Sequence, residues 1–259
     1  NILEEVKDLA IKGYKEITLL GQNVNSYGQK CTFECNFAEL LRRLSSVEGD
    51  YKLRFMTSHP KDATRELVDV MASSERIAKQ FHVPLQSGSN TILKAMNRGY
   101  TVEKYLDTVG YIREKMPDVT LTSDIIVGFP GETEEDFEAT LDVLRRVRYD
   151  MVYSFTYSPR TGTPAAEMAD QIAEDVKGER LRRLLELQTQ IAEEKNAELL
   201  ATEQRVLCYG TSKNNDGMLE GRTEGNKIVI FKGDSAFEGK YVNVKITETH
   251  PFVMYGEKY

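Results

Sequence analysis

Residues 120–133, T-L-T-S-D-I-I-V-G-F-P-G-E-T, decide the fold of this chain. The first half is rich in Leu, Ile and Val, which is typical of a strand buried on both faces of a parallel sheet. The strand breaks at Gly128, and Thr133 is a suitable N-cap for a helix that follows at once. In a barrel of such units, ligands bind where the strands end. Asp124, a carboxylate in an apolar strand, and Gly128, which permits close approach to the backbone, are therefore candidate binding residues.

The same alternation of strand and helix extends in both directions from this stretch. Further strands are expected at 16–20, 51–56, 80–85 and 151–157, and helices at 1–11, 37–44, 64–71, 91–96, 102–116 and 134–147. This spacing is that of βα units, so we expect a partial (β/α) TIM-like barrel. Polar residues follow each strand and predict a ligand-sized mouth at the carboxyl ends. A long helical pattern at 174–200 is expected to close this barrel and lead out of it.

The pattern changes after residue 202. Five short strands are expected at 205–209, 218–222, 227–231, 241–246 and 253–256, with turn residues such as 214–217 between them. They predict a small antiparallel β-barrel, of the size that binds oligonucleotides. The fold class is therefore α/β, with one domain at 1–200 and a second at 201–259.

The composition excludes few functions, but it indicates where the protein is located. The 259 residues are 40% hydrophobic, and the net charge of −7 gives no general attraction to nucleic acid. No apolar run reaches membrane-spanning length, so no membrane partner is expected. Three cysteines are too few for a disulfide framework and favour a cytoplasmic location. Oligomeric state is not predicted.

Several motifs together resemble one known family. They are G-Q-N-V-N at 21–25, S-H-P at 58–60, P-L-Q-S-G-S at 84–89, S-D-I-I-V-G-F-P-G-E-T at 123–133 and R-T-G-T-P-A at 160–165. The chain resembles the radical-SAM methylthiotransferases, most closely the group that makes 2-methylthio-adenosine in tRNA. The terminal barrel, with G-R-T at 221–223, is similar to that family's TRAM domain, an OB-like RNA-binding module.

The resemblance implies an activity. Family members use S-adenosylmethionine (SAM) and two 4Fe–4S clusters to add a methylthio group to C2 of N6-isopentenyladenosine, next to the anticodon. Electron transfer from one cluster cleaves SAM, and the resulting radical removes the C2 hydrogen. The implied partners are the anticodon stem-loop of tRNA and donors of sulfur and electrons.

The chain lacks the cysteine motif that binds a cluster in this family. The family's C-x3-C-x2-C triad is absent, and Cys31 and Cys35 reproduce only its first half, on a loop after the first expected strand. We therefore expect a fragment that lacks the family's N-terminal domain and the first barrel strand. Such a fragment would ligate neither cluster and would not catalyse alone.

The resemblance also assigns roles to residues. It implies that Gln22 and Asn23 contact the amino and carboxylate groups of SAM, and that Gln86 and Ser87 contact its other polar groups. Asp124 is expected to bind the ribose hydroxyls. The adenine is expected to lie against Val127, Gly128 and the backbone of 155–157, which includes Tyr157. Arg160 and Arg222 are the candidate RNA contacts. No residue is assigned to a metal, and no catalytic residue is named.

Other interpretations remain open from the sequence. Relatives act on threonylcarbamoyl-adenosine in tRNA or on a ribosomal-protein aspartate, and a non-catalytic RNA-binding module would carry the same terminal barrel. Asp124 could simply cap a loop, and the glycines could serve only the turn. Phe231, Tyr241, Phe252 and Tyr255 are either stacking surfaces for bases or core residues of the small barrel.

Overall fold

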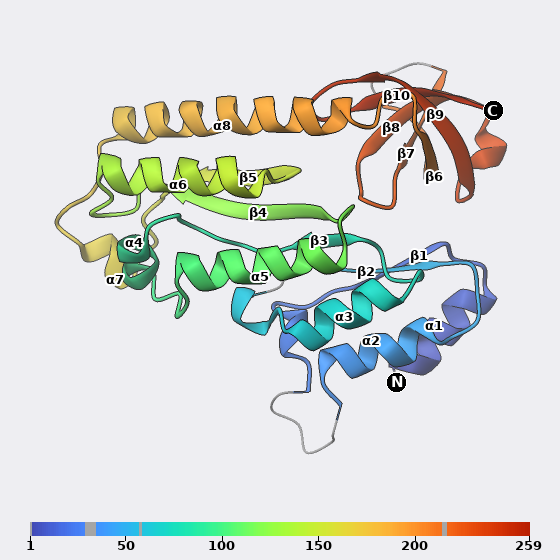
Figure 1. The fold of residues 1–259 in the computed structure, drawn as a ribbon, viewed down its shortest axis with the longest axis horizontal. Coiled ribbons are helices and arrows are strands. Elements are labelled where there is room, and N and C mark those ends of the chain that lie inside the picture. Colours follow the sequence, from blue (N-terminus) through green and yellow to red (C-terminus); the bar gives the residue numbers. More distant parts are fainter. Residues whose placement is uncertain (1, 29–34, 57–58, 214–216) are drawn as a thin grey trace.

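The computed structural model describes residues 2–28, 35–56, 59–213 and 217–259 (Figure 1). The strands of its first part are β1 (Glu16–Leu19), β2 (Lys52–Phe55), β3 (Gln80–His82), β4 (Thr120–Val127) and β5 (Met151–Thr156). Its helices are α1 (Ile2–Ile11), α2 (Phe37–Ser45), α3 (Arg65–Ser73), α4 (Asn90–Ala95), α5 (Val102–Lys115), α6 (Glu134–Val147), α7 (Pro164–Glu167) and α8 (Glu174–Ala197). The predicted alternation is confirmed, and only the short α7 was not expected.

The strands of this part run parallel. β1 pairs with β2, and β4 lies between β3 and β5. A bridge between Leu53 and Ile77 links the two sheets. A second bridge, between Gln86 and Ile125, continues the pairing with β4 beyond the end of β3. The helices pack against the strands through a buried core that includes Leu41, Phe81 and Phe137.

The sheet is not covered on both faces along its whole length. In β4, Ile125 and Val127 are buried, whereas Asp124 and Ile126 are partly exposed. This corrects the prediction of a strand buried on both faces, because the helices here pack against only one side. Asp124 is in register with Tyr153 of β5 and Ile126 with Phe155, so these four side chains share the face that we call the open face.

The turn after β4 forms for local reasons that the sequence shows. Gly128 has φ = +72°, a left-handed conformation that favours glycine. Thr133 then caps α6: its side chain accepts a hydrogen bond from the Asp136 N–H, and the Asp136 carboxylate accepts one from the Thr133 N–H. The expected strand, glycine turn and helix are confirmed.

The second part is a closed five-stranded barrel of β6 (Glu203–Thr211), β7 (Met218–Arg222), β8 (Ile228–Lys232), β9 (Tyr241–Thr249) and β10 (Met254–Lys258), in the order β10-β8-β7-β6-β9. Four neighbouring pairs are antiparallel, but β8 and β10 are parallel. The predicted small antiparallel barrel is confirmed, with one parallel pair at its closure, because an odd number of alternating strands must close with one parallel pair. Phe231 is fully buried in this barrel's own core and is therefore not a stacking surface.

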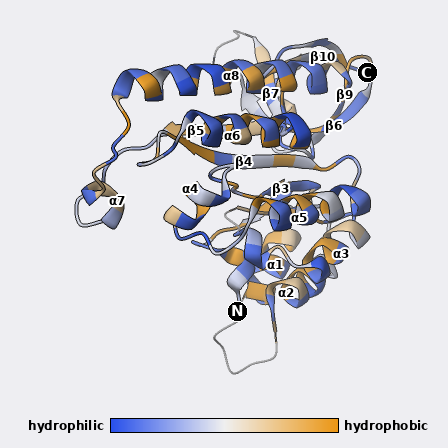
Figure 2. Ribbon diagram, turned by 60° about the vertical axis from the view of Figure 1, so that its left-hand side comes forward, coloured by the Kyte–Doolittle hydropathy of each residue, from blue (hydrophilic) through white to orange (hydrophobic). Residues whose placement is uncertain are grey.

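The small barrel contacts the amino ends of the parallel strands, away from the mouth (Figure 1). Arg54 of β2 is 7% exposed and donates hydrogen bonds to the carbonyl oxygens of Thr223 and Glu224, and to the side chains of Glu16 and Gln80. α8 runs from the mouth to the small barrel and is hydrophilic over most of its length (Figure 2). At its far end, Asn196 donates to the carbonyl oxygens of His250 and Pro251.

Candidate functional site

The carboxyl ends of β3, β4 and β5 bring five of the predicted site residues together. The Gln86 N–H donates to the Asp124 carbonyl oxygen at 2.8 Å, and the Tyr157 N–H donates to the Val127 carbonyl oxygen at 2.8 Å. Gly128 follows Val127 directly. We call this edge of the sheet the mouth, and its backbone is fixed by bonds between strand ends that lie far apart in the sequence.

Asp124 presents its carboxylate on the open face at this edge. Its side chain is 31% exposed, and Oδ2 lies 3.5 Å from Nε2 of His82. His82 Nδ1 lies 2.9 Å from the Thr122 hydroxyl, which holds the imidazole beside the carboxylate. Sequence reasoning did not select His82 as a site residue. The pairing of β3 with β4 nevertheless places residues 82, 122 and 124 on one face of the sheet. A half-exposed carboxylate with one imidazole neighbour retains lone pairs for a ligand.

Two charged residues from α8 fix the turn after β4. The Gly128 N–H donates to Glu132 Oε2 at 2.7 Å, and Arg180 donates to the same oxygen at 2.8 Å. The Glu132 side chain is fully buried, and burial raises the pKa of this carboxyl despite the two donors. Lys177 packs against Gly128 so closely that a Cβ there would lie 2.3 Å from Lys177 Cγ. The Lys177 ammonium donates to the Tyr157 carbonyl oxygen, so one helix connects the loops after β4 and β5.

Ser87 has a different placement from its neighbours. Its side chain is fully buried, and Oγ lies 3.4 Å from the Thr140 hydroxyl of α6. The same oxygen accepts a hydrogen bond from the Ser89 N–H. The hydroxyl is therefore directed into the protein, and Ser87 as a whole has no exposed surface at the mouth.

The end of β1 forms a second polar group. Gln22 is exposed, and Asn23 donates from Nδ2 to Asp62 Oδ2 at 2.7 Å. The side-chain oxygens of Asn23 and Asn25 are buried and have no hydrogen-bond partner among the residues that the structure describes. Since an unpartnered buried acceptor is costly, these oxygens are suited to a ligand that donates, such as an ammonium group.

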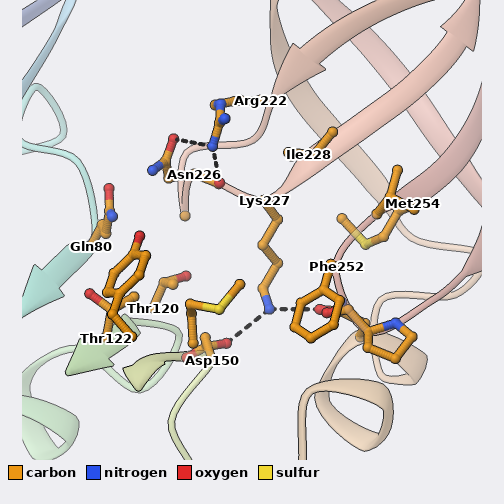
Figure 3. Close-up of a pocket in the computed structure, with 16 residues that line it drawn as sticks. Gln80, Thr120, Thr122, Asp150, Arg222, Asn226, Lys227, Ile228, Phe252 and Met254 are labelled. Atoms are coloured by element: carbon orange, nitrogen blue, oxygen red, sulfur yellow. Dashed lines mark hydrogen bonds and ion pairs between the residues drawn. The ribbon is translucent and has the colours of Figure 1, made fainter. Parts of the chain in front are cut away.

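The two candidate RNA contacts lie at opposite ends of the molecule. Arg160 is exposed in the loop between β5 and α7, at the mouth. Arg222 ends β7 and lies instead where the small barrel meets the parallel strands, beside Asn226, Lys227 and Asp150 (Figure 3). A pocket of about 100 Å³ lies there, between the two parts.

The described residues suit SAM, one of the expected cofactors. An unpartnered acceptor pair, a half-exposed carboxylate and a glycine turn suit the ammonium, ribose and adenine of SAM. In the described ranges, no group of three or more His, Cys, Asp or Glu is placed to hold a metal ion. Cys35 is half-buried and Cys208 lies in the core of the small barrel, whereas Cys31 and Ser58 fall outside the described residues. No helix in the described part of the chain is long and apolar enough to cross a membrane.

Comparison with known proteins agrees with this geometry. Residues 1–144 match the model of the radical SAM superfamily, and residues 199–258 match the TRAM domain. The chain belongs to the radical SAM superfamily, which implies SAM and a 4Fe–4S cluster as cofactors.

The curated relatives described next carry the same name. The chain is 54% identical to the tRNA-2-methylthio-N(6)-dimethylallyladenosine synthase of Thermoanaerobacter sp. (strain X514), over 99% of this chain and 55% of the relative. It is 52% identical to the protein of the same name from Carboxydothermus hydrogenoformans, over 99% and 58%. The chain thus spans about half the length of the curated relatives that it matches.

Among solved structures, the coproporphyrinogen III oxidase of Escherichia coli, described as a radical SAM enzyme, is similar in fold. The TM-score is 0.50 at 14% identity, covering 81% of this chain and 50% of that chain. At this identity the similarity shows the fold alone.

Proposed function

We propose that this chain is the SAM-binding and RNA-binding part of a tRNA methylthiotransferase. The reaction is the addition of a methylthio group to C2 of N6-isopentenyladenosine next to the anticodon. The observation that supports it best is the mouth, where Asp124, the Gly128 turn and the Tyr157 backbone form a site suited to SAM. The names of relatives that are more than 50% identical supply the choice of substrate.

Each part of the mouth has a role in this proposal. Asp124 accepts hydrogen bonds from the ribose hydroxyls, since a carboxylate is a strong bidentate acceptor. Val127, Gly128 and Tyr157 border the adenine through their backbone. Gln22 and Asn23 bind the amino and carboxylate groups. Gln86 contributes a polar side chain, whereas Ser87, which is fully buried, supports the loop through its contact with Thr140.

The chemistry depends on groups that this chain positions. SAM supplies the group that removes the C2 hydrogen and the methyl group that is finally transferred. Both 4Fe–4S clusters are held by segments outside this chain, and separate donors provide electrons and sulfur. The chain's own contribution is to orient SAM, to exclude water at the mouth and to hold the RNA.

The remaining assignments complete the proposal. The barrel domain spans 1–200 and the TRAM domain spans 201–259, a division supported by two separate hydrophobic cores. The TRAM domain and Arg160 bind the anticodon stem-loop of tRNA, and the enzyme acts in the cytoplasm.

The test uses the protein extended to the length of its relatives, with its clusters reconstituted under anaerobic conditions. Asp124→Ala should weaken SAM binding by about tenfold, because two hydrogen bonds to a charged acceptor are lost. Asp142→Ala, an exposed carboxylate on α6, is the matched control and should leave the affinity unchanged. Equal SAM affinity of the Asp124 variant and the wild type would refute the ribose role.

Substrate identity is read by mass spectrometry of nucleosides and protein after the reaction. We expect the methylthio group on isopentenyladenosine alone. Its appearance on a ribosomal protein alone, or on threonylcarbamoyl-adenosine alone, would refute the proposed substrate but not the chemistry.

A further inference from the structure

The pocket between the two parts of the molecule, the junction pocket, has features of a ligand site. One wall comes from β4 and β5, with Thr122 and Tyr153, and the other from the small barrel, with Arg222 and Phe252. Figure 3 shows Lys227 reaching across from the small barrel to Asp150, below Arg222 and Asn226. The hollow of about 100 Å³ has room for about three water-sized groups, which suits a phosphate rather than a whole nucleotide.

The pocket carries surplus positive charge in a chain that is acidic overall. Asp150 is 7% exposed and lies between two ammonium groups, at 3.1 Å from Lys195 and 2.9 Å from Lys227. One carboxylate therefore faces two cations. Arg222 donates hydrogen bonds to the two oxygens of Asn226, at 3.3 Å each, lies 6.0 Å from the centroid of the Tyr209 ring, and has no ion pair with any residue that the structure describes. An arginine whose charge is not neutralised is suited to bind a phosphate.

Two exposed aromatic rings stand at the edge of the same hollow. Tyr153 is 43% exposed and Phe252 is 52% exposed, and they come from different parts of the molecule. Aromatic surfaces beside cations are typical of sites where unpaired bases stack.

We propose that the junction pocket binds the phosphate of one nucleotide of single-stranded RNA at Arg222, with the base of that nucleotide stacked at the edge of the hollow on Tyr153 or Phe252. This inference rests on the proposed function and specifies where the RNA lies. Tyr153 is directly in register with Asp124, so the stacked base is about one strand spacing, roughly 5 Å, from the strand that carries the proposed SAM contact. The nucleotide therefore lies on the same face of the sheet as Asp124, toward the amino ends of the strands.

The test measures binding of a fluorescently labelled RNA stem-loop to the 259-residue chain itself. Tyr153→Leu and Phe252→Leu keep apolar bulk but remove the ring, and at least one should weaken binding by about tenfold. Arg222→Gln should weaken binding and reduce the slope of log affinity against log salt by about 0.7, the value for one phosphate of a single strand. The aromatic variants should leave that slope unchanged.

Matched controls come from exposed residues outside the pocket. Tyr14→Leu removes an aromatic ring that is 55% exposed, and Lys240→Gln removes an exposed cation of the small barrel; both should bind as the wild type does. Thermal unfolding of each variant shows whether it has folded. A fully paired RNA duplex of the same length should bind more weakly and be insensitive to Tyr153→Leu and Phe252→Leu.

Three outcomes would overturn the inference. These are wild-type affinity in all three pocket variants, equal loss of stem-loop and duplex binding in the aromatic variants, or no RNA binding by the chain at low salt. The first two leave the proposed function intact, because it is judged by SAM binding through Asp124 and by the modified nucleoside. The third would also count against the RNA-binding role of this chain.

Discussion

Removing Arg180 should cause a large, pH-dependent loss of stability. The Arg180 side chain is 6% exposed and pairs at 2.8 Å with Glu132, which is fully buried. In Arg180→Met the Glu132 carboxylate keeps, among the residues that the structure describes, only the Gly128 N–H as a donor, and it remains in a site of low dielectric. Removal of one partner of a buried pair costs about 3–5 kcal/mol of unfolding free energy, which lowers Tm by about 6–20 °C for a chain of this size.

The pH dependence follows from the carboxyl that remains. Burial already raises the pKa of Glu132 above its ordinary value of 4.5, so the folded state binds this proton more tightly than the unfolded state. Between 4.5 and the folded pKa, the free energy of unfolding therefore falls as pH rises. Loss of Arg180 raises the folded pKa further and widens this window. The loss of unfolding free energy in the Arg180→Met variant should be largest at neutral pH and smaller at about pH 5.

The assay is urea unfolding followed by circular dichroism at both pH values. Arg182→Met is the matched control on the same helix, since Arg182 is exposed and pairs only with exposed carboxylates, and it should cause no measurable change. The double variant with Glu132→Gln should recover part of the loss, because no charge is left buried. A loss below about 1 kcal/mol, or an equal loss at both pH values, would refute this account.

Three further outcomes are expected. Gly128→Ala should lower stability by about 1–3 kcal/mol in thermal unfolding, because φ is +72° and the new Cβ would meet Lys177; stability equal to the wild type would contradict the packing. Ser87→Ala should cost about 1–3 kcal/mol in the same measurement while SAM affinity stays unchanged, because its hydroxyl serves Thr140; a selective loss of SAM affinity would show a direct contact. Arg54→Met should let the small barrel unfold separately in calorimetry and expose the 198–202 linker to protease, and a single unchanged transition would argue against this anchor.

Local signals account for what the sequence predicted correctly. The apolar run of β4, the left-handed glycine after it and the Thr133 cap act within a few residues, so they can be read directly from the order of residues. The same holds for the strands of the small barrel, although its parallel closing pair follows from strand number rather than from any local pattern.

Contacts across long stretches of sequence account for what was missed. Glu132 and Arg180 are 48 residues apart, and nothing near either one shows that they pair. His82 looks like an ordinary strand residue until pairing with β4 places it beside Asp124. Ser87 looks like a mouth residue, but the left-handed Gln86 before it, with φ = +72°, changes the chain direction, and its hydroxyl faces α6.

Helix α8 sets a fixed length and a fixed rotational phase between the two ends of the molecule. Its 24 residues extend about 36 Å, with Arg180 held at the Gly128 turn and Asn196 held at the small barrel. One inserted residue would rotate the small barrel by about 100° about the helix axis and separate it from Arg54. Seven would nearly restore the angle but leave a gap of about 10 Å. Substitutions on the outer side of α8 are therefore tolerated far more readily than any change in its length.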